Sequence, residues 1–357
     1  EKGIFMLKTI LISSLMATSI LANTPISNQL ENRGFHVIDN EYNKLSIDIA
    51  ILLDTSGSMQ SLINQARAEI WKIINSLNNV TKNGVKPELR VSLFEYGKSS
   101  LPLSNGHLQM ISPLTTDLDI FSSKLFNLRT NGGDEFAPWV IQDASLDLKW
   151  STNKDSFKLI IIAGNEAFQQ GPVLINSASS IAKEKGIIVN SIFCGDYNNG
   201  IRSQWNIISN KTDGVYSNIN NNIVVEGIKT PYDDELLKLN RALNDTYIRY
   251  GDKGKEKREM QIQSDKQASG ISKSILAERT VAKASSNYKN DSWDMVDALE
   301  SGKEFKDIDK STLEDEYKNI SEQELEKIIE EKKVERKNIK EKIHNKNKLR
   351  DSLNIIF

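Results

Sequence analysis

The sequence predicts a doubly wound α/β fold, in which a mostly parallel sheet is covered by helices on both faces, followed by an α-helical C-terminal extension. Three observations lead to this. Apolar runs such as residues 47–53 lack polar alternation, which is typical of parallel strands buried on both faces. These runs alternate with segments of helical spacing, as in successive βαβ units. Beyond Pro231 they give way to segments rich in Lys, Glu, Asp and Gln.

The run at 47–53 ends in a polar loop, in which Asp54, Ser56 and Ser58 occupy alternate positions. Open α/β sheets place their ligand sites at the carboxyl ends of the strands. Carboxylate and hydroxyl oxygens are hard ligands that suit Mg²⁺, Ca²⁺ or Mn²⁺. The loop is therefore a candidate metal site. The alternative is an ordinary turn in which Ser56 or Ser58 caps the next helix.

The other elements of the predicted sheet domain follow from the same two periodicities. Helical spacing of Leu, Ile and Ala predicts helices, and apolar runs predict strands. A weaker stretch at 107–113 predicts a short edge strand, and 196–200 predicts an exit loop. The remaining expected elements are a helix at 61–77, a strand at 89–97, helices at 117–128 and 137–148, a strand at 158–164, a helix at 173–185, a strand at 187–194, and a last helix and edge strand within 205–216.

The loop at 54–58 matches the Asp-x-Ser-x-Ser signature of von Willebrand factor type A (VWA) domains, in which it opens the metal-ion-dependent adhesion site (MIDAS). The resemblance implies the doubly wound fold, with the domain at 45–228. It also implies a divalent cation, Mg²⁺ first, with Ca²⁺ or Mn²⁺ as alternatives. In that pattern Ser56 and Ser58 coordinate the ion, Asp54 supports it through water, and a protein partner adds an acidic residue.

The same resemblance points to a second loop at 129–135. In the commoner VWA pattern a threonine follows paired glycines, whereas here Asp134 follows Gly132 and Gly133. Glycines let the backbone turn tightly beside an ion. We expect Asp134 to supply the second loop, with Thr130 as the alternative ligand. An ordinary turn and helix cap is the competing interpretation.

A third loop should follow the strand at 158–164. Many VWA domains carry an aspartate and a glycine there, but this sequence has Ala163 and Gly164. In the family that aspartate usually acts through a bound water, so its absence does not remove the site. Asn165 or Glu166 is expected to take its place.

Residues 6–22 have the pattern of a secretory signal peptide, with Lys8, an apolar core and a small residue, Ala22, at the cleavage position. The core is shorter than the about twenty residues that a membrane-spanning helix needs. A retained N-terminal anchor is the alternative. We expect export to the periplasm or the cell surface, with 23–44 as a polar leader. Cys194, the single cysteine, should be a buried apolar residue.

Residues 229–357 are expected to form a charged helical extension, with a first helix at about 233–250. Residues 252–269 predict a solvated helix or a loose linker, 290–299 a short amphipathic helix, and Ser321 the start of a long charged helix. This order of segments resembles exported bacterial VWA proteins with a charged helical extension. The extension is either an appendage that packs on or projects from the sheet domain, or a partner-binding arm.

Local catalytic motifs are absent from the sequence: it has no Gly-x-x-x-x-Gly-Lys-Ser/Thr loop and no His-Glu-x-x-His helix, and Ser56 lies outside any Gly-x-Ser-x-Gly elbow. The net charge of −2 gives no electrostatic case for binding nucleic acid. We therefore expect an exported, metal-dependent protein-binding module, an adhesion or scaffold protein rather than an enzyme. The alternatives are a VWA scaffold with a degenerate or empty metal site, an accessory subunit of a chelatase or ATPase, and a metal-dependent hydrolase.

Overall fold

The computed structural model describes residues 43–77, 80–219 and 230–354. The predicted signal peptide at 6–22 and all but the last two residues of the polar leader at 23–44 lie outside these ranges. None of the helices in the described ranges combines the length and the hydropathy needed to cross a lipid bilayer.

A six-stranded sheet organises the first part of the chain, with the strand order β3-β2-β1-β4-β5-β6. Strand β3 is antiparallel to β2, and every other neighbouring pair is parallel. The order reverses on either side of β1, as in a doubly wound sheet, which confirms the predicted fold class. The strands are β1 (Ser46–Asp54), β2 (Glu88–Tyr96), β3 (Leu108–Thr115), β4 (Phe157–Gly164), β5 (Ile188–Cys194) and β6 (Tyr216–Ile219).

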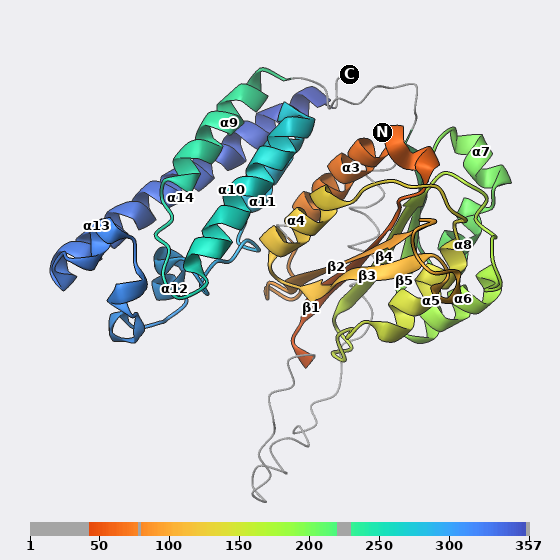
Figure 1. Cartoon of the computed structure of the whole chain (residues 1–357), viewed down its shortest axis with the longest axis horizontal. Helices are drawn as coiled ribbons and strands as arrows, with labels where there is room; N and C mark the ends of the chain where they lie inside the picture. The colour runs from red at the N-terminus through yellow and green to blue at the C-terminus, as the bar shows by residue number, and fades with distance from the viewer. Residues whose placement is uncertain (1–42, 78–79, 220–229, 355–357) are drawn as a thin grey trace, which may run out of the picture.

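Helices cover both faces of the sheet (Figure 1). Along β1, side chains of odd number, such as Ile49 and Ile51, join one core, and Ala50 and Leu52 join the other. All four are buried, which explains why the strand sequence lacks polar alternation. On the Ile51 face lie α3 (Ile63–Ser76) and α4 (Leu118–Asn127); on the opposite face lie α5 (Ala137–Asp147), α6 (Ile175–Glu184) and α8 (Trp205–Lys211).

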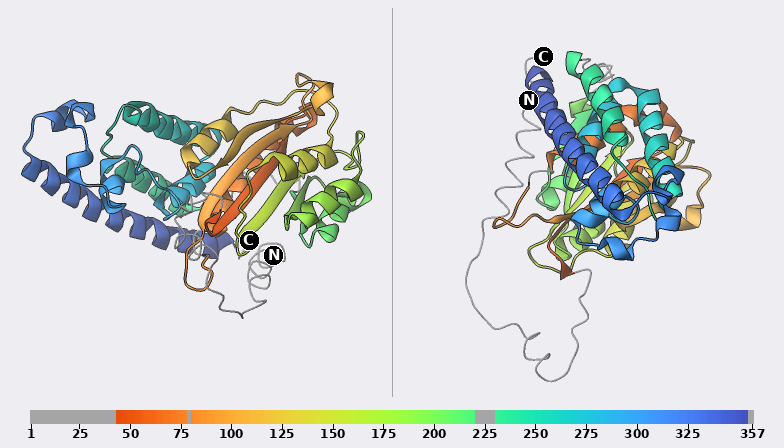
Figure 2. Two further views of the ribbon diagram at one scale, coloured as in Figure 1. Left: turned by 90° about the horizontal axis from the view of Figure 1, so that it is seen from below. Right: turned by 90° about the vertical axis from the view of Figure 1, so that its left-hand side faces the viewer.

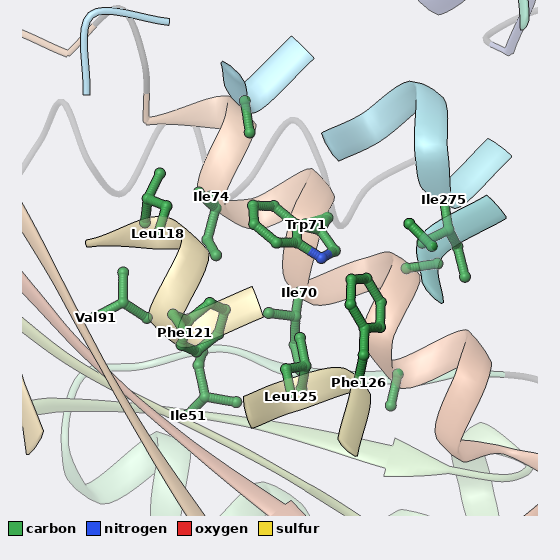
Figure 3. Packing of buried hydrophobic residues seen from close by; sticks show 14 of the residues in the cluster. Ile51, Ile70, Trp71, Ile74, Val91, Leu118, Phe121, Leu125, Phe126 and Ile275 are labelled. Atoms are coloured by element: carbon green, nitrogen blue, oxygen red, sulfur yellow. The ribbon is translucent and has the colours of Figure 1, made fainter. Parts of the chain in front are cut away.

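The larger core extends beyond the sheet domain. Figure 3 shows Trp71 of α3 and Phe121 of α4 at its centre, with Ile51 and Val91 on the sheet side. The two rings meet edge to face at 6.0 Å, a favoured aromatic geometry. Ile275, from the C-terminal part of the chain, packs on the other side of the same cluster. One continuous apolar core therefore joins the sheet domain to the helices that follow it.

The C-terminal helices form a layer against α3 and α4 (Figure 1). Helix α10 contacts α4, and α11 contacts α3. Helix α14 runs along the whole helical region (Figure 2) and contacts α9, α11 and α12. The helices of this region are α9 (Pro231–Asn244), α10 (Gly254–Ile271), α11 (Lys273–Ala284), α12 (Met295–Glu300), α13 (Asp315–Lys318) and α14 (Glu322–Asn354).

Two arginines fix α14 to the rest of this layer. Arg336 donates to Asp294 at 2.6 Å, and its guanidinium also lies 4.3 Å from the ring centre of Tyr247. Near the end of the helix, Arg350 donates to Asp233 at 2.7 Å and to Glu278 at 2.6 Å. Both arginine side chains are buried. The charged sequence of α14 thus includes a contact face that is held by buried ion pairs as well as by apolar residues.

Several segments differ from the sequence prediction: the helix expected at about 233–250 ends at Asn244, α12 begins only at Met295, and α11 was not predicted. The predicted exit loop contains a short helix, α7 (Tyr197–Arg202), whose start is capped by Asp196 accepting from the Asn199 backbone N–H. Six residues are too few to show a helical period. The segment predicted as a solvated helix or linker is α10, a helix with one buried face formed by Gln261, Asp265 and other residues. A buried face made of polar residues that pair across an interface has no apolar periodicity, so it cannot be recognised in the sequence.

Candidate metal centre

The first loop of the predicted site lies at the carboxyl end of β1. Asp54 is the last residue of that strand and is fully buried. Its Oδ1 atom accepts from the Ser56 backbone N–H at 2.7 Å. Its Oδ2 atom is buried and has no hydrogen-bond partner within the described residues. A buried carboxylate oxygen without a partner carries a large desolvation cost, so Asp54 Oδ2 is a candidate ligand atom for a cation or another bound group.

The two serines and the third loop come together beside Asp54. The hydroxyl oxygens of Ser56 and Ser58 lie 2.8 Å apart. The Ser58 hydroxyl also donates to Asn165 Oδ1 at 2.9 Å. Strands β1 and β4 are neighbours, so the loops that follow them share one edge of the sheet. The structure thus brings Asp54, Ser56, Ser58 and Asn165 into one group of oxygen atoms.

The second loop also lies against the first. A Cβ atom on Gly57 would be 3.5 Å from the Gly132 nitrogen, and the Asn131 backbone N–H donates to the Thr55 carbonyl at 2.9 Å. Within this loop, however, Asp134 is exposed and Thr130 is only half-buried. In the part of the chain that the structure describes, the side chains of Thr130 and Asp134 form no hydrogen bond with the loop at 54–58.

Glu135, which the sequence did not single out, is the acidic residue of this loop that turns inward. It is 6% exposed. A Cβ atom at position 97 would lie 2.7 Å from Glu135 Cγ and 2.8 Å from Asp54 Oδ1, so both carboxylate side chains border Gly97. The Gln170 side-chain amide donates to Glu135 Oε2 at 3.3 Å. No sequence signal separates Glu135 from Asp134, because packing against Gly97, which follows β2, decides which carboxylate is buried.

Burial and nearby negative charges disfavour the charged forms of these two carboxylates. Burial raises the pKa of Asp54 to about 7, and the charge of Glu166 adds to the increase. Burial and the nearby charge of Asp54 raise the pKa of Glu135 to about 8. Carboxyl groups close together in a poorly solvated place behave in this way, and a bound cation reverses it.

Aromatic side chains crowd the end of β4, where the third loop begins. The Tyr96 hydroxyl donates to the Ala163 carbonyl at 3.0 Å. A Cβ atom on Gly164 would lie 2.5 Å from that hydroxyl oxygen and 2.9 Å from the Trp205 ring. Tyr96 and Trp205 therefore fill the space at this strand end. Glu166 is exposed, and its backbone carbonyl accepts from Trp205 Nε1 at 2.8 Å.

The donor set fits a hard divalent cation. Carboxylate, hydroxyl and amide oxygens are the ligands that Mg²⁺ and Ca²⁺ prefer, and Asp54 Oδ2 has no hydrogen-bond partner among the residues that the structure describes. Within the described residues no three or more His, Cys, Asp or Glu side chains are grouped so that they could hold a metal ion. A cation here would therefore depend on the serine hydroxyls and the Asn165 amide as well as on carboxylates.

Comparisons with known proteins find likeness at the level of structure. No family model matches the chain, and no curated protein matches it. One similar solved structure is the SpRpn10 VWA domain, at 19% identity and a TM-score of 0.35, over 49% of this chain and 89% of that one. A second is the conserved hypothetical protein BatB from Bacteroides thetaiotaomicron, at 17% identity and a TM-score of 0.35, over 49% of this chain and 91% of that one. A third is proximal thread matrix protein 1 from the mussel byssus with a zinc-occupied MIDAS motif, at 13% identity and a TM-score of 0.36, over 51% of this chain and 43% of that one.

Proposed function

We propose that the sheet domain is a protein-binding module that depends on a divalent cation, Mg²⁺ in the first place. The observation that carries the proposal is the buried, unpartnered Oδ2 atom of Asp54 beside the adjoining hydroxyls of Ser56 and Ser58. A protein retains an uncompensated buried carboxylate only when something else offsets its desolvation. A hard cation does so with the ligand types that are present.

In this proposal each of the three loops contributes residues to the cation site. Ser56 and Ser58 hold the ion directly, and Asp54 supports it through water. The resemblance to VWA domains assigns Asp134 to the second loop, with Thr130 as the alternative, and Asn165 and Glu166 to the third loop. The bound ion would offer one coordination position to a partner. The electrostatic attraction between the ion and an acidic side chain is strong where water is excluded. The residues of the chain would fix its place, and the surrounding surface would select the partner.

The partner is proposed to be a protein that contributes an acidic side chain to that position. We further propose that the chain is exported to the periplasm or the cell surface, on the strength of the signal-peptide pattern at 6–22. A binding role needs no general acid, base or nucleophile. Cation binding by itself accounts for the oxygen atoms that are grouped at the site.

A VWA scaffold without a functional metal site is the second candidate. The observation that favours it is Ala163 at the end of β4, where many VWA domains carry an aspartate, with Tyr96 and Trp205 filling the adjacent space. Such a protein would use the same surface without an ion. The two candidates predict different responses to Mg²⁺.

Calorimetric titration of the purified protein with Mg²⁺, Mn²⁺ and Ca²⁺, together with thermal unfolding, tests the proposal. We expect wild type to bind and to be stabilised, by about 2.7 kcal/mol when the free ion is at a hundred times its dissociation constant. Asp54→Ala and Ser56→Ala should remove both effects. Ser76→Ala is the matched control, because Ser76 is exposed at the far end of α3 and donates to the Ile73 carbonyl within its own helix. Wild type without binding heat or thermal shift would establish the metal-free scaffold instead.

The partner is tested by capture from a native envelope fraction, first with Mg²⁺ and then with a chelator. A protein retained by wild type in Mg²⁺, released by chelator, and not retained by Asp54→Ala is the expected result. Retention that is indifferent to the chelator and to the substitution would contradict metal dependence.

A further inference from the structure

We propose that Glu135 is the second carboxylate of the cation site and faces the ion together with Asp54. This inference rests on the proposed cation site and deepens it, because it identifies a ligand that the Asp-x-Ser-x-Ser pattern does not contain. Asp134, its neighbour in the sequence, would then be a surface residue.

Buried acidic residues elsewhere in the described chain are paired with a cationic side chain. Lone buried charges are costly, so such pairing is the rule in proteins. Among the described residues nine acidic side chains are buried, and the two of them that form no ion pair there are Asp54 and Glu135. The other seven and their partners are Asp48 with Arg90, Glu95 with Lys98, Asp119 with Arg279, Asp233 with Arg350, Asp265 with Arg279 and Lys283, Glu278 with Arg350, and Asp294 with Arg336.

The two exceptions lie at the same place. Both side chains border the position that a Cβ atom of Gly97 would occupy, within 2.7 Å for Glu135 Cγ and 2.8 Å for Asp54 Oδ1. The hydrogen bond from Gln170 to Glu135 is long, at 3.3 Å, and Asp54 Oδ2 has no partner in the described residues. The positive charge that every other buried carboxylate receives from Lys or Arg is therefore absent here. A divalent cation would supply it to both at once.

Backbone packing holds Glu135 in this inward position. Gly97 has a φ of +78°, which places it in the left-handed region favoured by glycine. A Cβ atom on Gly133 would lie 2.5 Å from the Ser99 backbone nitrogen, so the second loop fits tightly against the chain that follows β2. The Ser99 backbone N–H also donates to the Gly132 carbonyl. These contacts fix the loop immediately before Glu135 and leave Asp134 at the surface.

The experiment compares Glu135→Gln with Asp134→Asn in the full-length protein. Each change removes one negative charge and nearly preserves the shape, and the two positions are adjacent. Titration with MgCl₂ by calorimetry, and with MnCl₂ by electron paramagnetic resonance, measures the cation affinity. We expect Glu135→Gln to weaken binding at least about tenfold, as loss of a supporting carboxylate does in other metal sites. Asp134→Asn should change it less than about threefold.

Thermal unfolding without added metal shows whether each variant folds. Because an unpaired buried carboxylate is unfavourable, Glu135→Gln should unfold at the same temperature as wild type or higher, and its cation-induced increase should be smaller than that of wild type. Binding by wild type and equal binding by Glu135→Gln would overturn this inference and leave the proposed function standing. A large loss in Asp134→Asn alone would make Asp134 the ligand. Absence of binding by wild type would overturn both the proposed function and this inference.

Discussion

The guanidinium of Arg279 lies 2.6 Å from the carboxylate of Asp119, and both side chains are almost completely buried. Arg279 belongs to α11 of the helical region, and Asp119 belongs to α4 of the sheet domain. The Tyr288 hydroxyl donates to the second oxygen of Asp119 at 2.6 Å. This contact is enclosed by the shared apolar core, so the helical region and the sheet domain should unfold together rather than as independent units.

Replacing Arg279 with Leu should destabilise the whole protein by about 3–5 kcal/mol, because it leaves Asp119 and Asp265 buried without their shared partner. Urea denaturation followed by tryptophan fluorescence and by circular dichroism measures this. Lys183→Ala is the control, since its pair with Asp213 is exposed and 3.6 Å long and should contribute less than about 1 kcal/mol. Two separate transitions, with the sheet domain unaffected, would contradict the expectation of cooperative unfolding.

The pH dependence of stability should contain a contribution from Asp265. Burial acts to raise the pKa of this carboxyl, but Lys283 and Arg279 outweigh it and hold the pKa well below its usual range. A carboxyl whose pKa is lower in the folded state contributes stability above its unfolded pKa of 3.8, and loses it as the pH falls below that value. Urea unfolding between pH 7 and pH 2.5 should therefore show a shallower acid loss in Asp265→Asn than in wild type, from a lower starting stability. Parallel curves would show that Asp265 contributes nothing to the slope.

Central strands of the sheet such as β1 and β4 could be predicted, because each contains a run of consecutive apolar residues. The apolar run of β1 and the oxygen donors that end it are contiguous, so the fold class and the first loop could be inferred from the sequence. The sequence could not show which of Asp134 and Glu135 is the buried carboxylate of the second loop. That depends on packing beside Gly97, which lies nearly forty residues away in the chain. The burial of α10 was hidden for a similar reason: Asp265 pairs with cations of another helix.

Gly97 should tolerate no side chain, and a second glycine allows a matched comparison. Gly97 and Gly84 have the same φ of +78°, but a Cβ atom at Gly84 meets nothing within 4 Å. Gly84→Ala should therefore cost only the conformational strain of about 1–2 kcal/mol. Gly97→Ala should cost more and should also weaken Mg²⁺ binding, because its methyl group would displace Asp54 and Glu135. Urea denaturation and calorimetry measure the two effects. Equal losses in both variants, with the Mg²⁺ affinity unchanged, would show that the space at Gly97 is not required.

The two candidate residues of the third loop should differ in their effect on cation binding. Asn165 Oδ1 accepts from the Ser58 hydroxyl at 2.9 Å and so helps to orient a proposed ligand, whereas Glu166 is exposed. Asn165→Ala should weaken Mg²⁺ binding by about 10-fold or more, as loss of a residue that orients a ligand commonly does. Glu166→Gln should weaken it only a few-fold, and the difference from wild type should shrink at high salt, since an exposed charge is screened. Titration at 20 mM and 500 mM NaCl separates the two roles. A larger and salt-independent loss in Glu166→Gln would instead make Glu166 the third-loop ligand.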